Sequence, residues 1–593
     1  MLYPQDSETR EVKDLNGIWA FKADVDGVAA RDAWHAAPLR DAGHMPVPAS
    51  YNDITQDVRV RDLIGAAYYE REVRIPATWS ARRIVLRFGA VTHHATVWLD
   101  GVEIARHKGG FLPFEIDITQ RVEPAGVYRL TVAADNVLDW TCLPPGEIID
   151  RSDPAHAPGY RVQEIHFDFF NYAGLHRPVR LLALPPVGID AVRVRTDRDG
   201  DTGVVDYAVA VGDAALRVEV ALEDATGAVV ARSRGAEGRV RVDQARLWRP
   251  GAPYLYRLVC RAHDASGAVA DVYRERVGIR SLSWGAEGVA INGEPFYFRG
   301  FGKHEDADLR GRGWDTVTAV KDCEILRWIG ANSFRTAHYP YAEEMLRLAD
   351  EYGLVVIDEC PGVGMCKFRR DRLPIFTDDE LTAGRRAHHV QVMRDLVARD
   401  ANHPSVVMWS VANEAATWEA ESADYFRAVI DATRAADATR PVMLVVHVQP
   451  GECHASGMAD VIGINRYPGW YTDPGHTEFI TRQFAAELAA WWERFGKPIV
   501  VTEYGADTVA GIHADPPTMF SEEYQCAMLA AMHAAFDANP HVIGEHVWNF
   551  ADFRTKQGIT RVDGNRKGVF TRDRRPKMAA HLLRERWTAH RAR

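Results

Sequence analysis

The residues best suited to chemistry in this 593-residue chain are carboxylates that directly follow short apolar segments in its second half. Glu414 ends the segment SVVMWSVANE, and Glu503 lies in PIVVTEYG. If these segments are strands of a parallel barrel, side chains at their carboxyl ends meet at one face. Two carboxylates there can act as general acid and nucleophile on an acetal, because negative charge stabilises its cation-like transition state. We therefore expect Glu414 and Glu503 to form a catalytic pair.

A metal site is the competing interpretation, because the same segment ends also carry histidines and aspartates. Their polar and aromatic residues are Lys303 to Asp306, His338, Asp358, Glu359, Asn413, Asn465 to Tyr467, Tyr504, Trp548 and Asn549. None of them stands in an HxH, HExxH or clustered-carboxylate spacing. We expect no metal and no cofactor. Either glutamate alone is compatible with an ion pair or a helix cap, and it is the pair that favours catalysis.

The elements that must position these residues alternate between short apolar strands and amphipathic helices, a pattern typical of βα units. Eight strand candidates are found at 296–302, 331–338, 354–362, 405–414, 440–446, 461–467, 498–505 and 542–550. Helical periodicity is found between them, for example over 314–330, 341–353, 388–400, 422–437 and 523–538. Eight such units predict a (β/α)8 TIM barrel over residues 283–593.

Two β-rich regions precede the barrel. Residues 1–182 contain alternating segments such as GIWAFKAD, RRIVLRFGAV and YRLTVAAD, which predict a jelly-roll β-sandwich. Residues 183–282 repeat the alternation at shorter spacing and predict an immunoglobulin-like β-sandwich without a disulfide. The fold class is thus multidomain, two β-sandwiches followed by an α/β barrel.

Composition excludes several classes of partner. The formal net charge is −11, which disfavours loose binding to nucleic acid or to an anionic membrane surface. The seven cysteines are scattered without a CxxC pair, which indicates a reducing compartment. We find no signal peptide and no apolar run long enough to span a membrane. We therefore expect a cytoplasmic protein that binds neither nucleic acid nor membranes.

The chain resembles glycoside hydrolase family 2 over nearly its whole length. The matching segments are LNGIWAF, HFDFFNYAGLHRPV, GFGKHEDADLRGRG, NSFRTAHYPYAEEM, ARDANHPSVVMWSVANE, VTEYGADT, GEHVWNFADF and GNRKGVFTRDRRPK. The resemblance implies that Glu414 is the acid/base, that Glu503 is the nucleophile, and that Asn413 holds the sugar's 2-hydroxyl. Such an enzyme acts by double displacement with retention of configuration. For these roles Glu414 should have a raised pKa while Glu503 stays ionised.

Within the family the resemblance is to exo-acting enzymes that release D-glucuronate from β-D-glucuronides. Asn565 and Lys567 in GNRKG match the element that binds the substrate carboxylate in those enzymes. An ammonium and an amide facing a carboxylate recover much of its desolvation cost, whereas a neutral CH2OH would leave the lysine unpaired. The resemblance implies further substrate-binding residues, which are Asp168, His338, Asn465, Tyr467, Tyr471, Trp548 and Arg561.

Two alternatives remain open at this point. A β-galacturonidase or mixed uronidase is the nearest alternative among enzymes, because Asn565 and Lys567 would bind the carboxylate without distinguishing the C4 epimers. A catalytically inactive carbohydrate-binding protein is the alternative of another class, although such proteins commonly lose one of the two glutamates. The resemblance also implies a homo-oligomer, a tetramer or a dimer.

A basic segment follows the third predicted barrel strand in an otherwise acidic chain. It contains Lys367, Arg369, Arg370 and Arg372. We hypothesise that it contacts an acidic aglycone or oligosaccharide, and the alternative is a solvated loop.

Overall fold

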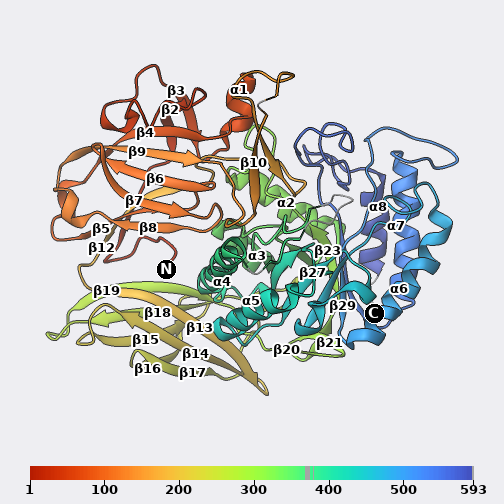
Figure 1. Ribbon diagram of the computed structural model, residues 1–593. Helices are drawn as coiled ribbons and strands as arrows, with labels where there is room; N and C mark the ends of the chain where they lie inside the picture. The colour runs from red at the N-terminus through yellow and green to blue at the C-terminus, as the bar shows by residue number, and fades with distance from the viewer. Residues whose placement is uncertain (152, 368–373, 378, 590–593) are drawn as a thin grey trace.

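The fold is described from a computed structural model of the 593 residues, and the description covers all of them except 152, 368–373, 378 and 590–593. Three consecutive parts of the chain form two β-sandwiches and one closed barrel. In Figure 1 the sandwiches lie to the left, one above the other, and the barrel with its helices lies to the right. The predicted fold class is confirmed.

The first sandwich consists of two antiparallel sheets. One sheet has the order β1 (Glu11–Asp14), β12 (Val179–Leu184), β5 (Arg83–Phe88), β8 (Phe114–Asp117). The other has the order β3 (Gly43–Val47), β2 (Gly17–Ala23), β4 (Ala66–Arg74), β9 (Val127–Asp135), β6 (His94–Leu99), β7 (Val102–Lys108). Alternate side chains point between the sheets, where Trp19, Tyr69, Leu86 and Val132 are buried. A short helix α1 (Val58–Arg61) and the hairpin of β10 (Gly146–Asp150) and β11 (Arg161–Ile165) complete this part.

The second sandwich is smaller. Its sheets have the orders β13 (Ile189–Asp199), β14 (Thr202–Val211), β17 (Glu237–Val242) and β16 (Val229–Arg234), β15 (Arg217–Glu223), β18 (Tyr256–His263), β19 (Val269–Val277). Val220, Leu258 and Cys260 lie in the core of this sandwich. As predicted, it contains no disulfide, since all seven cysteines of the chain are free thiols. The predicted domain boundaries at 182 and 282 stay predictions. Residue 182 lies inside β12, which ends at Leu184, and the next strand begins at Ile189.

The barrel is closed by eight parallel strands, and each of them coincides with one of the predicted segments. They are β23 (Phe298–Gly302), β24 (Ser333–Arg335), β25 (Val355–Glu359), β26 (Val406–Asn413), β27 (Val442–Val446), β28 (Val461–Asn465), β29 (Ile499–Glu503) and β30 (Val542–Val547). The last strand pairs with the first in parallel. All eight carboxyl ends therefore face one mouth.

An α-helix follows every barrel strand except β27. The helices are α2 (Thr316–Ile329), α3 (Glu343–Tyr352), α4 (Glu380–Asp400), α5 (Ser422–Ala436), α6 (Ile480–Phe495), α7 (Glu522–Asp537) and α8 (Met578–Ala589). Residues 447–460, all of which are described, form only the 3-10 turns η5 (Pro450–Glu452) and η6 (Ser456–Met458) between β27 and β28. The βα alternation predicted from the sequence is thus interrupted at one place.

A small sheet closes the end of the barrel opposite the mouth. It consists of β20 (Leu282–Gly285), β21 (Gly288–Ile291) and β22 (Glu294–Phe296). Val289 and Ile291 from this sheet pack in one cluster with the inward-facing Phe298, Val355 and Ile357 of the barrel strands. Apolar side chains therefore fill this end of the barrel.

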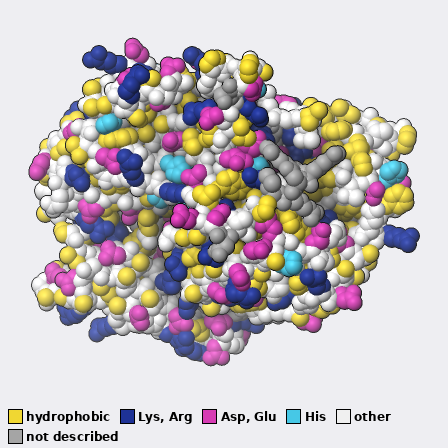
Figure 2. Space-filling view, viewed as in Figure 1, with side chains coloured by type: hydrophobic (Ala, Val, Ile, Leu, Met, Phe, Trp, Pro, Cys, Tyr) yellow, Lys and Arg dark blue, Asp and Glu magenta, His cyan; other side chains and the backbone are white. Residues whose placement is uncertain are grey.

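The molecular surface carries a mixture of charges. In Figure 2, basic and acidic side chains lie interspersed on the visible face. Among the described residues, no helix combines the length and the apolar character that crossing a membrane requires.

Candidate active site

Glu503 lies buried in the barrel mouth at the end of β29, with donors on both of its carboxylate oxygens. The Arg335 guanidinium, at the end of β24, donates to Oε1 at 2.5 Å, and the Tyr467 hydroxyl donates to Oε2 at 2.6 Å. His338 Nε2 lies 3.7 Å from Oε1. Arg335 also donates to both oxygens of Glu359, at 2.7 and 2.8 Å. One buried guanidinium thus bridges two buried carboxylates and fixes the orientation of Glu503.

Burial raises the pKa of Glu503 to about 8 and so favours its neutral form. The Glu414 carboxylate acts in the same direction, whereas Arg335 and the Tyr467 hydroxyl lower the pKa. This differs from the expectation that Glu503 simply stays ionised, because no sequence pattern reports how completely a carboxylate is removed from water. The ionised form of Glu503 is stabilised by Arg335 and Tyr467, which donate hydrogen bonds to separate carboxylate oxygens.

Glu414 follows β26 and has a left-handed backbone conformation with φ of 51°. Such a conformation costs free energy for a residue with a side chain and is found preferentially at functional sites. It is held by a hydrogen bond from the Glu414 backbone N–H to the Val445 carbonyl at 3.0 Å. Asn465, at the end of β28, donates from Nδ2 to Glu414 Oε1 at 2.8 Å and to Asn413 Oδ1 at 3.0 Å. Asn465 therefore orients the glutamate and holds the side chain of Asn413 beside it.

Aromatic side chains form the wall beside Glu503. Trp548 stacks on His338 with ring centroids 5.0 Å apart and an interplanar angle of 24°. Phe169, from the first sandwich, stacks on the same histidine at 6.1 Å. Gly505 allows the close approach of Trp548, because its φ is +156° and a Cβ there would lie 2.3 Å from the Trp548 carbonyl oxygen. The glycine of TEYG is thus required by packing around the site.

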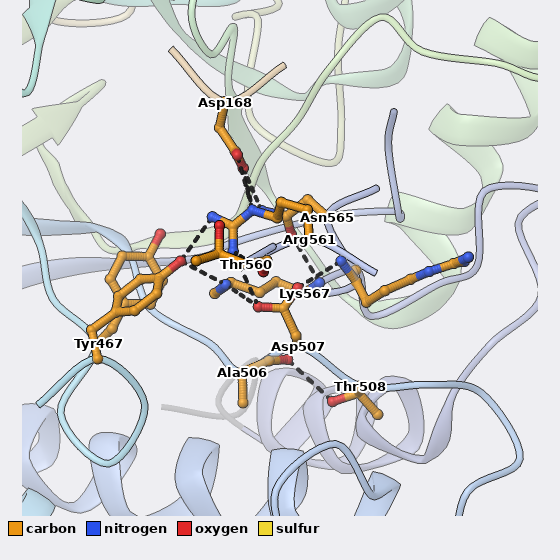
Figure 3. Close-up of polar contacts among 12 residues, drawn as sticks. Asp168, Tyr467, Ala506, Asp507, Thr508, Thr560, Arg561, Asn565 and Lys567 are labelled. Carbon is orange, nitrogen blue, oxygen red and sulfur yellow. Dashed lines mark hydrogen bonds and ion pairs between the residues drawn. The ribbon is translucent and has the colours of Figure 1, made fainter. Parts of the chain in front are cut away.

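Next to this wall lies a buried cationic cluster (Figure 3). Lys567 is fully buried, and its ammonium contacts the carboxylate of Asp507 and, at 3.0 Å, the Tyr471 hydroxyl. Arg561 donates to the same hydroxyl at 2.8 Å. The rings of Tyr467 and Tyr471 are 5.2 Å apart, so the cluster adjoins the hydroxyl that binds Glu503.

The first sandwich contributes Asp168 to this cluster, from the segment that follows its β10–β11 hairpin. Arg561 donates to both oxygens of Asp168, at 2.9 and 3.0 Å, and Asn565 Nδ2 donates at 2.7 Å. The loop after β30 folds back on itself through a bridge between Phe553 and Asn565. Gly564 permits this bridge, because its φ is +97° and a Cβ would lie 2.5 Å from the Phe553 carbonyl oxygen.

All of the predicted site residues lie in one connected network, although their roles stay predictions. Sequence reasoning missed Arg335 and Asp507, and it named Glu359 only as a strand-end residue. Arg335 ends a strand whose carboxyl end faces the mouth, so its position could have indicated it. Asp507 lies in a loop four residues after Glu503, and no sequence signal places its side chain on Lys567.

Of the basic segment, Arg369, Arg370 and Arg372 lie outside the described residues. Lys367 is described, and its ammonium lies 3.3 Å from the Glu147 carboxylate and 4.7 Å from the ring centroid of Trp140. The charge of Lys367 therefore joins the barrel to the first sandwich. Among the residues that the structure describes, no group of three or more His, Cys, Asp or Glu side chains has a geometry suited to a metal ion.

Comparison with known families divides the chain into three parts. The family models match residues 12–185 (glycosyl hydrolases family 2, sugar binding domain), 187–280 (glycosyl hydrolases family 2) and 285–591 (glycosyl hydrolases family 2, TIM barrel domain). Similar sequences include Beta-glucuronidase of Paenibacillus borealis, 52% identical over 99% of this chain and 98% of that protein. Beta-glucuronidase of Homo sapiens is 46% identical over 99% of this chain and 92% of that protein.

Solved structures agree with the sequence comparison. The β-D-glucuronidase of Dictyoglomus thermophilum has a TM-score of 0.94 and 46% identity, with 99% of both chains covered. The β-glucuronidase of Ruminococcus gnavus in complex with D-glucaro-d-lactam has a TM-score of 0.93 and 39% identity, also with 99% of both chains covered. Because the family models match nearly the whole chain and the similarity extends over all three parts, this chain belongs to glycosyl hydrolase family 2.

Proposed function

We propose that this protein is a retaining exo-β-glucuronidase, which hydrolyses β-D-glucuronides to D-glucuronate and an aglycone. The observation that carries the specificity is the buried cluster of Lys567, Arg561 and Asn565 beside the two glutamates. A buried ammonium and a half-buried guanidinium suit a sugar carboxylate, because each provides charge-assisted hydrogen bonds in a site shielded from water. The names of the similar proteins point to the same activity.

In the first step Glu503 attacks the anomeric carbon while the glycosidic C–O bond breaks. Glu414 transfers its proton to the departing oxygen, so the aglycone leaves as a neutral alcohol. Arg335 and Tyr467 orient the attacking carboxylate. Asn413 contributes an amide for the 2-hydroxyl, an interaction that strengthens in the transition state.

In the second step Glu414 acts as a base. It takes a proton from a water molecule, whose oxygen attacks the anomeric carbon and displaces Glu503. Two inversions give net retention, and Glu414 regains its proton, so the enzyme is restored without a cofactor.

The test is hydrolysis of p-nitrophenyl β-glucuronide beside the β-galacturonide and the β-galactoside. We expect the wild type to prefer the glucuronide and Glu503→Gln to lose hydrolysis of all three. Lys567→Ala should reduce kcat/KM for uronides by about 10- to 150-fold, since a hydrogen bond to a charged group contributes roughly 1.5–3 kcal/mol. Lys556→Ala is the matched control, because the Lys556 side chain is 47% exposed and pairs with Glu164.

Two results would contradict the proposal: a preference for the neutral galactoside, or full activity of Glu503→Gln. A preference for the galacturonide would favour the alternative uronidase. Retention is checked by NMR, because a retaining enzyme first forms the β-anomer of the free sugar from a β-glycoside. The expected homo-oligomer and cytoplasmic location stay predictions, and light scattering on the purified protein checks the former.

A further inference from the structure

Asp507 is the one carboxylate in direct contact with Lys567 among the described residues. Its Oδ2 pairs with the Lys567 ammonium and lies 3.6 Å from Nη1 of Arg561. Its Oδ1 accepts a hydrogen bond from the Arg566 backbone N–H at 2.8 Å. Only 5% of the Asp507 side chain and 1% of the Lys567 side chain are exposed. The pair is therefore largely shielded from water, and its charges interact strongly.

The charges of the cluster balance before any substrate binds. Lys567 and Arg561 are opposed by Asp507 and Asp168, and Figure 3 shows the four side chains linked by their contacts. A uronate carboxylate that reaches Lys567 adds a negative charge next to Asp507. It must therefore share the ammonium with a carboxylate that is already there.

Lys567 has contacts besides Asp507 that orient it. The ammonium lies 4.8 Å from the ring centroid of Tyr471, 5.2 Å from that of Trp470 and 5.6 Å from that of Tyr467. The Tyr471 hydroxyl accepts one of its hydrogen bonds. Three aromatic rings and a hydroxyl thus hold the cation in place through packing and cation–π attraction.

We propose that Asp507 is a resident counter-ion of Lys567, which competes with the substrate carboxylate and so weakens the binding of uronate substrates and products. Asp507 acts through Lys567 and touches no reacting atom. This inference rests on the proposed function. It implies that affinity for the sugar acid is kept below the value that the lysine alone would give, so that D-glucuronate leaves the site readily after hydrolysis.

The test is Asp507→Asn, which keeps the size of the side chain and removes its charge. We expect KM for p-nitrophenyl β-glucuronide and the inhibition constant of D-glucuronate to fall by about tenfold, equivalent to about 1.4 kcal/mol. The rate constant kcat should stay within about twofold of wild type, because Asp507 touches no reacting atom. For the neutral β-glucoside, kcat/KM of Asp507→Asn should not rise above the wild-type value. This sugar has no carboxylate, so in the variant it leaves the Lys567 ammonium without a counter-ion.

Asp563→Asn is the matched control, since Asp563 lies in the loop after β30 that carries Lys567, its side chain is 88% exposed and it pairs with Arg566. It should leave both constants unchanged. Asp507→Ser provides a second uncharged variant, and the melting temperature of each variant shows whether it is folded.

A folded, uncharged variant with an unchanged or raised inhibition constant for D-glucuronate would overturn the inference. The proposed function would survive that result if Lys567→Ala still lost its preference for uronides. If the wild type failed to hydrolyse uronides, the proposed function itself would be wrong.

Discussion

Replacing Arg335 with lysine tests how the nucleophile is kept in its reactive form. The guanidinium makes one hydrogen bond to Glu503 and two to Glu359, all between 2.5 and 2.8 Å. Lysine retains the positive charge, but its single ammonium cannot reproduce a planar fork that serves two carboxylates. We expect the new ammonium to pair with Glu359, which accepts two of the three hydrogen bonds in the wild type. The hydrogen bond to Glu503 should then be lost.

The lost contact determines the size of the effect. A hydrogen bond to a charged group contributes roughly 1.5–3 kcal/mol, which corresponds to about 10- to 150-fold in kcat/KM. The pH dependence has a defined sign. Burial raises the pKa of Glu503 to about 8 and Arg335 lowers it, so losing the contact raises the pKa further. Because Glu503 must be ionised to attack, the acid limb of kcat/KM moves to higher pH.

The assay is a pH profile of kcat/KM for p-nitrophenyl β-glucuronide, measured for the wild type and Arg335→Lys. Arg327→Lys is the control. The Arg327 side chain, in α2, is 67% exposed and forms an ion pair with Glu324, which is also at the surface. If Arg335→Lys retained wild-type kcat/KM and an unmoved acid limb, the reasoning that Arg335 maintains the ionised nucleophile would be refuted.

Three further substitutions test other parts of the site. Tyr467→Phe removes the 2.6 Å hydroxyl contact to Glu503 and should lower kcat/KM about tenfold with an acid limb at higher pH; an unchanged pH profile would contradict this. Glu414→Ala should lower kcat/KM, which reports the first step alone, by about 10²–10⁴-fold for a methyl glucuronide and far less for a 2,4-dinitrophenyl glucuronide, which needs no proton to leave; equal losses in kcat/KM would exclude the acid role. Gly505→Ala should reduce stability by about 1–3 kcal/mol in calorimetry, because its Cβ would lie 2.3 Å from the Trp548 carbonyl oxygen. Gly451→Ala, where a Cβ meets nothing within 4 Å, is its control.

The sequence predicted the architecture well because the signals that define it are local. Alternation with period two predicted both sandwiches, and the alternation of strands and helices predicted all eight barrel strands. The connection after β27 was the exception, since a segment that packs without an α-helix carries no periodic signal. Glu414 and Glu503 were found for a related reason, as the end of a parallel strand places a side chain at the barrel mouth.

Contacts between distant segments were decided only by the tertiary structure. Asp168 and Arg561 are 393 positions apart and meet because the first sandwich packs beside the barrel mouth. The pairing of Asp507 with Lys567 arises from two loops whose direction no spacing rule describes.

The electrostatics of the site depend on the same packing. Strand periodicity determines which residue ends a strand, and therefore the sequence alone placed Glu503 at the barrel mouth. The pKa of that carboxyl depends on desolvation and on charges within a few ångströms, which only the neighbours in space supply. The chemical groups were thus determined by the sequence, and their protonation and charge balance by the fold.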